Sequence, residues 1–201
     1  MKEKKIIGLT GTYCAGKNHV ASLLEALGLP VLDVDKLGHK VIESEKELLL
    51  SCFGKEVLGP DGSIDRKRLG AKVFGNPEKL ATLEKIIHPA VNRETLSWIS
   101  SRREKACVIN AALLHRSSAF NVLDAIIIVE AHFLVRLLRA KKRDHLPWAT
   151  LIKRFKSQTK FHAQYFQGKT DIYRVENSGF FKQKSRNRLE NSIKEIISLL
   201  E

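Results

Sequence analysis

The stretch Gly11-Thr12-Tyr13-Cys14-Ala15-Gly16-Lys17-Asn18 follows the pattern G-x-x-x-x-G-K of a phosphate-binding loop. The apolar run over 5–10 predicts a buried strand before it, and apolar residues at helical spacing predict a helix near 16–27 after it. In that context backbone N–H groups turn toward phosphate oxygens, the helix N-terminus adds partial positive charge, and Lys17 reaches the outer phosphates. The alternative interpretation is an ordinary glycine-rich turn with a solvated lysine.

Asn18 departs from the usual pattern, which places Ser or Thr after the lysine as a ligand of Mg²⁺. An asparagine side-chain oxygen is also a hard ligand, but the side chain is longer and would act directly or through a bound water. We therefore expect metal binding to be altered, and not necessarily lost.

Composition limits the classes of partner and compartment. The 201 residues suit one substantial domain, and the formal charge of +13 favours anionic partners. The basic residues are not interleaved with aromatic ones, which argues against nucleic acid. There is no secretory signal and no apolar stretch of membrane-spanning length, which argues against a membrane. We expect a cytoplasmic monomer or small homo-oligomer.

The three cysteines are odd in number and lack the spacing of metal ligands, which indicates free thiols in a reducing compartment. Cys14 lies close in sequence to Lys17 and to a helix N-terminus, an environment of the kind that lowers the pKa of a thiol and makes it oxidisable. The favoured interpretation is nevertheless an inert small side chain.

Alternating elements predict an α/β fold with a parallel sheet. Further strands are expected at 30–33, 106–109 and 125–129. Helices are expected at about 132–142, as an amphipathic helix over 189–200, and through most of about 37–103, with a turn at 59–62. Asn76 and Pro77 suit the N-cap and first residue of a helix within that last region.

Asp33 and Asp35 are expected at the end of the second strand, where open α/β sheets bind their ligands. One carboxylate can hold Mg²⁺, directly or through water, and the other can accept a proton from an acceptor hydroxyl. Asp is also a good helix N-cap, and capping can coexist with catalysis.

Arg136, Arg139 and Arg143 recur at spacings of three and four on the predicted basic helix, so they share one face. Beside a phosphate loop, this face predicts a lid that neutralises charge on a transferred phosphoryl group. The alternative is a solvated basic helix.

At this point the chain resembles the dephospho-CoA kinases, phosphate-loop kinases of coenzyme A synthesis. The matching residues, spread over most of the chain, are Gly8-Leu9-Thr10-Gly11, Gly16-Lys17, Val31-Leu32-Asp33-Val34-Asp35, Phe53-Gly54, Asp61-Gly62, Asp65-Arg66, Leu69, Phe74, Asn76-Pro77, Leu83, His88-Pro89, Arg139, Arg143-Asp144, Arg154, Gln158 and Glu176-Asn177-Ser178-Gly179. The resemblance implies a three-layer phosphate-loop NTPase fold and phosphorylation of the 3′-hydroxyl of dephospho-CoA by ATP with Mg²⁺. It implies one kinase domain over 1–201, with a helical acceptor-binding region at about 37–103 and a basic lid at about 139–170.

Roles follow residue by residue from this resemblance. Asp35 is the implied catalytic base, assisted by Lys17, Arg139 and Arg143. The implied ATP-binding residues are Gly11, Thr12, Tyr13, Cys14, Ala15, Gly16, Lys17, Asn18, Asn177 and Gly179. The implied acceptor-binding residues are Thr10, Asp33, Asp35, Arg66 and His88, and the implied metal ligands are Asn18 and Asp33. His88, before a proline, also suits a packed structural histidine.

Three departures bear on acceptor specificity. The segment Ala112-Leu113-Leu114-His115-Arg116 stands where the family usually has Pro-Leu-Leu-x-Glu, so a proline is absent and a carboxylate is replaced by Arg116. Ala149 stands where a lid glutamate is common. Two alternatives therefore stay open: a kinase of another small acceptor, such as a nucleoside monophosphate, and a nucleotide-binding regulator with impaired catalysis.

Overall fold

The computed structural model describes residues 4–157, 161, 165, 170–179 and 182–200, except for the side chains of residues 118 and 182–186. The chain divides into two compact units. The first comprises residues 1–32 and 102–201, and the second comprises residues 33–101. Gln158 and parts of the predicted lid lie outside the described residues.

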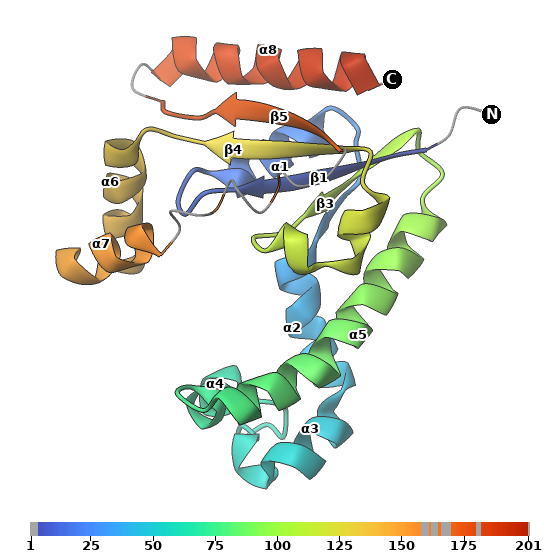
Figure 1. Ribbon diagram of the computed structural model, residues 1–201, viewed down its shortest axis with the longest axis vertical. Coiled ribbons are helices and arrows are strands. Elements are labelled where there is room, and N and C mark those ends of the chain that lie inside the picture. The colour runs from blue at the N-terminus through green and yellow to red at the C-terminus, as the bar shows by residue number, and fades with distance from the viewer. Residues whose placement is uncertain (1–3, 158–160, 162–164, 166–169, 180–181, 201) are drawn as a thin grey trace. The chain divides into compact units, whose positions relative to one another are not determined.

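A five-stranded sheet forms the centre of the first unit, with the strand order β2-β3-β1-β4-β5 (Figure 1). Its strands are β1 (Lys5–Gly11), β2 (Val31–Asp33), β3 (Ala106–Asn110), β4 (Ala125–Glu130) and β5 (Asp171–Glu176). Strand β1 pairs in parallel with β3 and with β4, and β4 pairs in parallel with β5. This arrangement confirms the parallel sheet and the four predicted strands, whereas β5 was not predicted.

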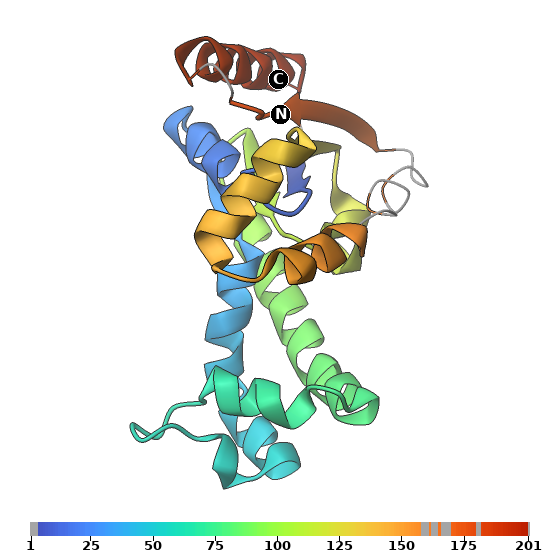
Figure 2. The same cartoon turned by 90° about the vertical axis from the view of Figure 1, so that its left-hand side faces the viewer.

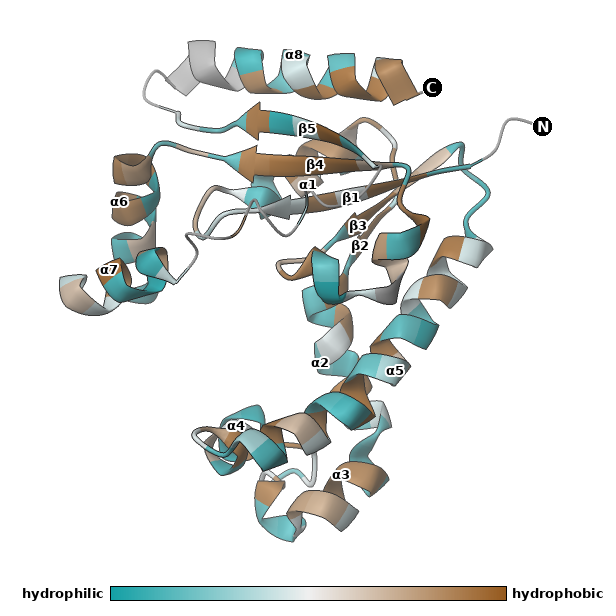
Figure 3. Ribbon diagram, in the orientation of Figure 1, coloured by the Kyte–Doolittle hydropathy of each residue, from teal (hydrophilic) through white to brown (hydrophobic). Residues whose placement is uncertain are grey.

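The core packs against this sheet because its central strands are mostly apolar and buried. Every residue of β3 is buried, as are the first five residues of β4, which Figure 3 colours as hydrophobic. Helix α1 (Lys17–Ala26) contributes Val20 and Leu24 to this core, and α8 (Lys182–Leu200) contributes Leu189 and Ile193. The predicted helix after the loop and the predicted C-terminal amphipathic helix are both confirmed.

Two basic helices, α6 (Phe133–Asp144) and α7 (Trp148–Lys156), follow β4 and lie side by side (Figure 2). They pack through Ala140, Leu151 and Phe155, a small cluster that also takes in Tyr13 and Cys14 from the phosphate loop. The predicted helix over 132–142 is confirmed, and α7 is an addition to it. Two short 3-10 helices, Leu114–Arg116 and Ser118–Val122, connect β3 to β4.

The second unit is helical, as predicted. It comprises α2 (Val34–Ser44), α3 (Lys46–Phe53), a 3-10 turn (Lys55–Val57), α4 (Arg66–Val73) and α5 (Pro77–Ser101). Its core includes Leu49, Phe53 and Leu69, with Leu83 packed against them. The predicted turn forms, with the Gly62 N–H donating to the Gly59 carbonyl at 3.1 Å. The Asn76 side chain accepts from the Lys79 N–H at 3.0 Å, which confirms the predicted cap.

Among the residues that the structure describes, no helix is long and apolar enough to cross a membrane.

Candidate functional site

The phosphate loop occupies the turn between β1 and α1, where its sequence predicts it (Figure 1). Its backbone requires special residues: Gly16 caps α1 with φ 94°, and Cys14 also adopts a positive φ of 59°. A Cβ at Gly16 would clash with Asn177 Nδ2, and one at Gly11 would approach the Val129 carbonyl oxygen to 2.7 Å. These glycines let neighbouring segments close on the loop, and its helix start offers N–H groups to an anion.

Lys17 is fixed by a residue that the sequence did not single out. Its Nζ donates to Oδ1 of Asn110, the last residue of β3, and Asn110 is only 2% exposed. Because a buried amide oxygen needs a donor, this pair holds the Lys17 ammonium beside the loop. A polar residue ending an otherwise apolar strand was the available sequence signal.

The loop's Ala15 carbonyl accepts hydrogen bonds from two predicted site residues. Arg139 Nη1 donates to it at 3.1 Å and Asn177 Nδ2 donates to it at 2.8 Å. Asn177 follows β5, and its backbone N–H donates to the Glu130 carbonyl at 2.7 Å, so the sheet fixes its position. Gly179 completes this group, since a Cβ there would lie 3.3 Å from Arg139 Nη2. The structure thus brings Gly16, Arg139, Asn177 and Gly179 together.

The arginine face of α6 turns toward the loop. The Arg136 guanidinium lies 5.0 Å from the centroid of the Phe155 ring, and that of Arg143 lies 5.1 Å from the centroid of the Tyr13 ring. Together with the Arg139 contact, these positions give each of the three arginines a partner within the fold, although the Arg143 side chain is 60% exposed. They leave the lid interpretation standing.

The structure fits the interpretation of Cys14 that the sequence favours, an inert small side chain. Burial raises the pKa of this thiol, and the opposing influence of Arg143, Arg136 and Arg139 is weaker than the cost of burying a thiolate. The pKa of the Cys14 thiol is thus shifted away from the low values of reactive cysteines.

Thr10, a predicted acceptor-binding residue, belongs to a buried polar cluster at the end of β1. The Tyr165 hydroxyl lies 3.4 Å from Thr10 Oγ1 and 3.2 Å from His115 Nδ1, and Thr10 donates to the Ala112 carbonyl at 3.4 Å. Tyr165 is only 1% exposed and packs its ring against His115, Phe120 and Phe161. Sequence reasoning missed Tyr165 because its surroundings show no periodicity.

The Tyr165–His115 contact predicts a pH-dependent contribution to stability. Burial, and secondarily the Arg116 charge, lowers the pKa of His115. The unfolded chain then binds more protons as pH falls through about 6.5, so the stability gained from neutral His115 is present at pH 7 and is lost toward pH 5. We expect His115→Gln to cost about 1 kcal/mol at pH 7. Urea unfolding at a series of pH values should show this difference shrinking toward pH 5, and a constant difference would contradict the assignment.

Asp33, Asp35, Arg66 and His88 belong to the second unit. Asp33 ends β2 and caps α2, accepting from the Lys36 N–H at 3.0 Å. Asp35 lies in the first turn of α2, so the prediction that both aspartates end the strand is wrong for Asp35. The cause is the Asp33 cap, which starts the helix at Val34, earlier than predicted. Arg66 begins α4, and His88 precedes Pro89 inside α5.

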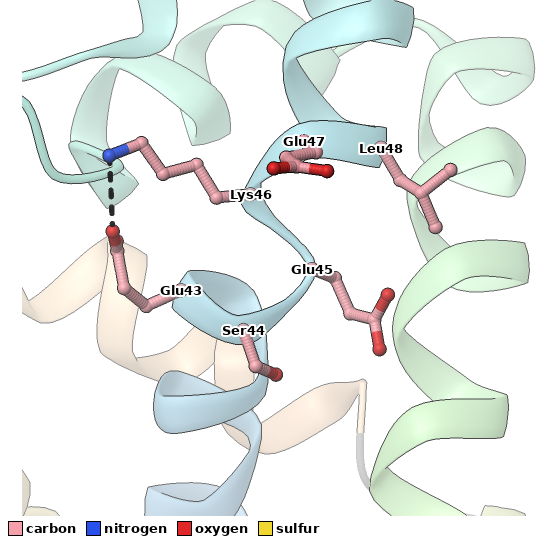
Figure 4. Close-up of a pocket in the computed structure, with 6 residues that line it drawn as sticks. All are labelled: Glu43, Ser44, Glu45, Lys46, Glu47 and Leu48. Carbon is pink, nitrogen blue, oxygen red and sulfur yellow. Dashed lines mark ion pairs between the residues drawn. The ribbon is translucent and has the colours of Figure 1, made fainter.

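A pocket of about 410 Å³ lies elsewhere in the second unit, at the junction of α2 and α3 (Figure 4). Two of its acidic residues, Glu43 and Glu45, have structural partners. Glu43 accepts from the Ile64 N–H at 2.9 Å and pairs with Lys46 at 3.5 Å, and Glu45 pairs with Arg93 at 3.2 Å. No predicted site residue lines this pocket.

Within the described part of the chain, no three His, Cys, Asp or Glu side chains group as metal ligands would. Asn18, the predicted ligand, is the second residue of α1, and its side chain is exposed.

Comparisons with known proteins agree with this geometry. A family model described as dephospho-CoA kinase matches residues 5–180. A dephospho-CoA kinase of Treponema denticola is 32% identical over 185 residues, which cover 87% of this chain and 83% of that protein. The crystal structure of TT1252 from Thermus thermophilus covers 100% of both chains with a TM-score of 0.81 and 29% identity.

A shikimate kinase from Bacteroides thetaiotaomicron, at 16% identity and a TM-score of 0.53 over 98% of both chains, shares the fold. These similarities confirm the phosphate-loop kinase fold that the sequence predicted. The chain belongs to the dephospho-CoA kinase family.

Proposed function

We propose that the protein transfers the γ-phosphoryl group of ATP to the 3′-hydroxyl of dephospho-CoA, giving coenzyme A and ADP. The observation that carries the proposal is the phosphate loop whose Lys17 is held by the buried Asn110. Membership of the dephospho-CoA kinase family supports this choice of acceptor. The three free cysteines support a cytoplasmic reaction.

In this proposal ATP binds along the loop from Gly11 to Asn18, with Asn177 and Gly179 at its nucleoside end. Arg139 and Asn177 donate to the Ala15 carbonyl, which favours a loop whose N–H groups remain available to phosphate. Two buried atoms beside the loop, Thr12 Oγ1 and Arg136 Nε, have no hydrogen-bond partner within the described residues. A phosphate-bearing ligand supplies the acceptors that such donors need.

The proposed reaction is an in-line displacement. The 3′-oxygen of the acceptor bonds to the γ-phosphorus, the bond from that phosphorus to the β–γ bridging oxygen breaks, and ADP leaves. Asp35 accepts the hydroxyl proton, and Lys17, Arg139 and Arg143 neutralise charge on the moving phosphoryl group. Thr10, Asp33, Arg66 and His88 orient the acceptor, which assigns the helical region 37–103 to acceptor binding and 139–170 to the lid.

Magnesium fits the donors that the chain offers. Mg²⁺ is commonly held by one or two protein oxygens together with phosphate and water, and Asn18 and Asp33 carry such oxygens. When bound, the ion neutralises charge on the β- and γ-phosphates.

Changing Asn18 to serine tests this assignment. A shorter hydroxyl suits the usual geometry after the loop lysine, so we expect Asn18→Ser to lower the Mg²⁺ concentration for half-maximal rate by roughly tenfold. Asn121→Ser, at an exposed position of a 3-10 helix, is the control. An Asn18→Ser enzyme with an unchanged Mg²⁺ titration would remove Asn18 from the metal site.

Coupled ADP release with a panel of acceptors tests the proposed substrate. Dephospho-CoA should give a strong acceptor-dependent rate, whereas AMP and CMP should not exceed the rate without acceptor. Turnover of a nucleoside monophosphate, with none of dephospho-CoA, would reject dephospho-CoA as the acceptor. The exposed Arg116 would then indicate a different acceptor specificity.

A further inference from the structure

We propose that Tyr13 is a positioning residue, whose hydroxyl fixes the Asp144 carboxylate so that Asp144 holds Arg143 and Arg154 beside the phosphate loop. The inference deepens the proposed function and rests on it for its kinetic readout. Its structural basis is a polar network that joins the loop to both lid helices.

The contacts converge on the two oxygens of Asp144. The Tyr13 hydroxyl donates to Oδ2, as does Arg154 Nη1 at 3.4 Å. Arg143 donates to Oδ1 from Nε at 2.7 Å and to Oδ2 from Nη2 at 3.3 Å. Arg154 Nη1 also donates to the Tyr13 hydroxyl at 3.3 Å. The tyrosine hydroxyl thus sits between the carboxylate and a second arginine.

Packing holds the Tyr13 ring independently of its hydroxyl. The ring meets Phe155 edge to face with centroids 5.2 Å apart, and the Arg143 guanidinium lies over the ring, 5.1 Å from its centroid. Phe133 packs in turn on Phe155 at 5.3 Å. A phenylalanine at position 13 preserves this aromatic packing and removes only the hydrogen bonds.

Asp144 is less exposed to solvent than the two arginines that it holds. The Asp144 side chain is 16% exposed, while those of Arg143 and Arg154 are 60% and 51% exposed. Hydrogen bonds from Arg143 and then Tyr13 hold the pKa of Asp144 at about 2, so the anchor is ionised at neutral pH. Arginine carries five N–H donors, and Arg143 directs two of them to Asp144.

Fixing both guanidinium groups before a nucleotide arrives lowers the conformational entropy lost when they meet its phosphates. The phosphate-loop pattern leaves the side chain at position 13 free, so this chain uses an otherwise unassigned position to couple loop and lid. Removal of the hydroxyl should therefore act mainly on the transition state that Arg143 stabilises.

The test is a double-mutant cycle on the full-length protein. We expect Tyr13→Phe to lower kcat roughly tenfold with little change in the KM for ATP, and Asp144→Asn to lower it at least as much. The double variant should match Asp144→Asn alone, because Tyr13 acts through Asp144. Tyr173→Phe removes a hydroxyl from the half-buried tyrosine of β5 and serves as the matched control. If Asp144→Asn fails to fold, Arg154→Gln replaces it in the cycle.

A spectroscopic readout keeps this inference separable from the proposed function. The Arg143 Nε–H proton resonance, assigned by its loss in Arg143→Lys, should lie downfield in the unmodified protein. It should move upfield in Tyr13→Phe but not in Tyr173→Phe. If those shifts are observed in a protein that shows no turnover, the inferred network is supported and the proposed reaction is rejected.

Three results would overturn the inference. One is an unchanged Arg143 resonance in Tyr13→Phe. Another is a double variant in which the fold-losses of kcat in the two single variants multiply. The last is a rise in kcat on removing the hydroxyl, which would mean that the network withholds Arg143 from the phosphates.

Discussion

Replacing Lys17 with methionine should lower kcat/KM for ATP by about 10²–10³-fold, the usual cost of losing one preorganised charge-stabilising donor. Methionine keeps most of the side chain's volume and removes the ammonium that Asn110 holds beside the loop. It also leaves the buried Asn110 oxygen without this donor, which should cost about 1–3 kcal/mol of stability. Initial rates at varied ATP and urea unfolding separate the two effects.

Lys105→Met is the matched control for this experiment, because Lys105 is exposed and precedes β3, whereas Asn110 ends it. Its kinetics should equal those of the unmodified protein. Full activity in Lys17→Met would show that the loop lysine does not contribute to phosphate binding or transfer.

Asp35→Asn should lower kcat by about 10²–10⁴-fold, the range typical for loss of a general base, while ATP binding is retained. The substitution keeps the shape of the side chain and removes its ability to accept the hydroxyl proton. Single-turnover rates with dephospho-CoA, together with equilibrium binding of ATP, measure the two properties independently.

Substitutions at two other carboxylates, Glu47 and Asp33, distinguish loss of the base from loss of helix stabilisation. Glu47 lies exposed in the first turn of α3, so Glu47→Gln removes the same favourable interaction with a helix N-terminus and should leave kcat unchanged. Asp33→Asn retains a good N-cap on α2, so its effect reports the negative charge alone. An Asp35→Asn enzyme with full turnover and normal ATP binding would reject Asp35 as the base.

Local sequence patterns predicted the elements whose burial is simple. Strands β3 and β4 were predictable because full burial requires a continuous apolar run. The loop was predictable because its backbone conformation requires glycine. Strand β5 escaped prediction because only Val175 is buried in it and three of its six residues, Asp171, Arg174 and Glu176, are charged. In α7, Trp148, Leu151 and Phe155 do recur at helical spacing, so that helix carried a usable signal.

The missing parts of the candidate site depend on contacts between distant positions. Lys17 and Asn110 are 93 residues apart, and Tyr13 and Asp144 are 131 residues apart. No local pattern reveals such partners. The direction of the pKa shift at Cys14 has a related origin, because its basic neighbours are visible in the sequence whereas the burial that outweighs them arises only in the fold.

The product made from ATP and dephospho-CoA is the most direct test of the proposed kinase. Mass spectrometry after incubation of the purified protein with Mg²⁺ should find a product one phosphoryl group heavier than dephospho-CoA, carrying that group on the 3′-oxygen, with one ADP formed for each product. Lys17→Met, incubated in parallel, should form little of it. Bound ATP with no heavier product would contradict the account and leave a nucleotide-binding protein without this activity.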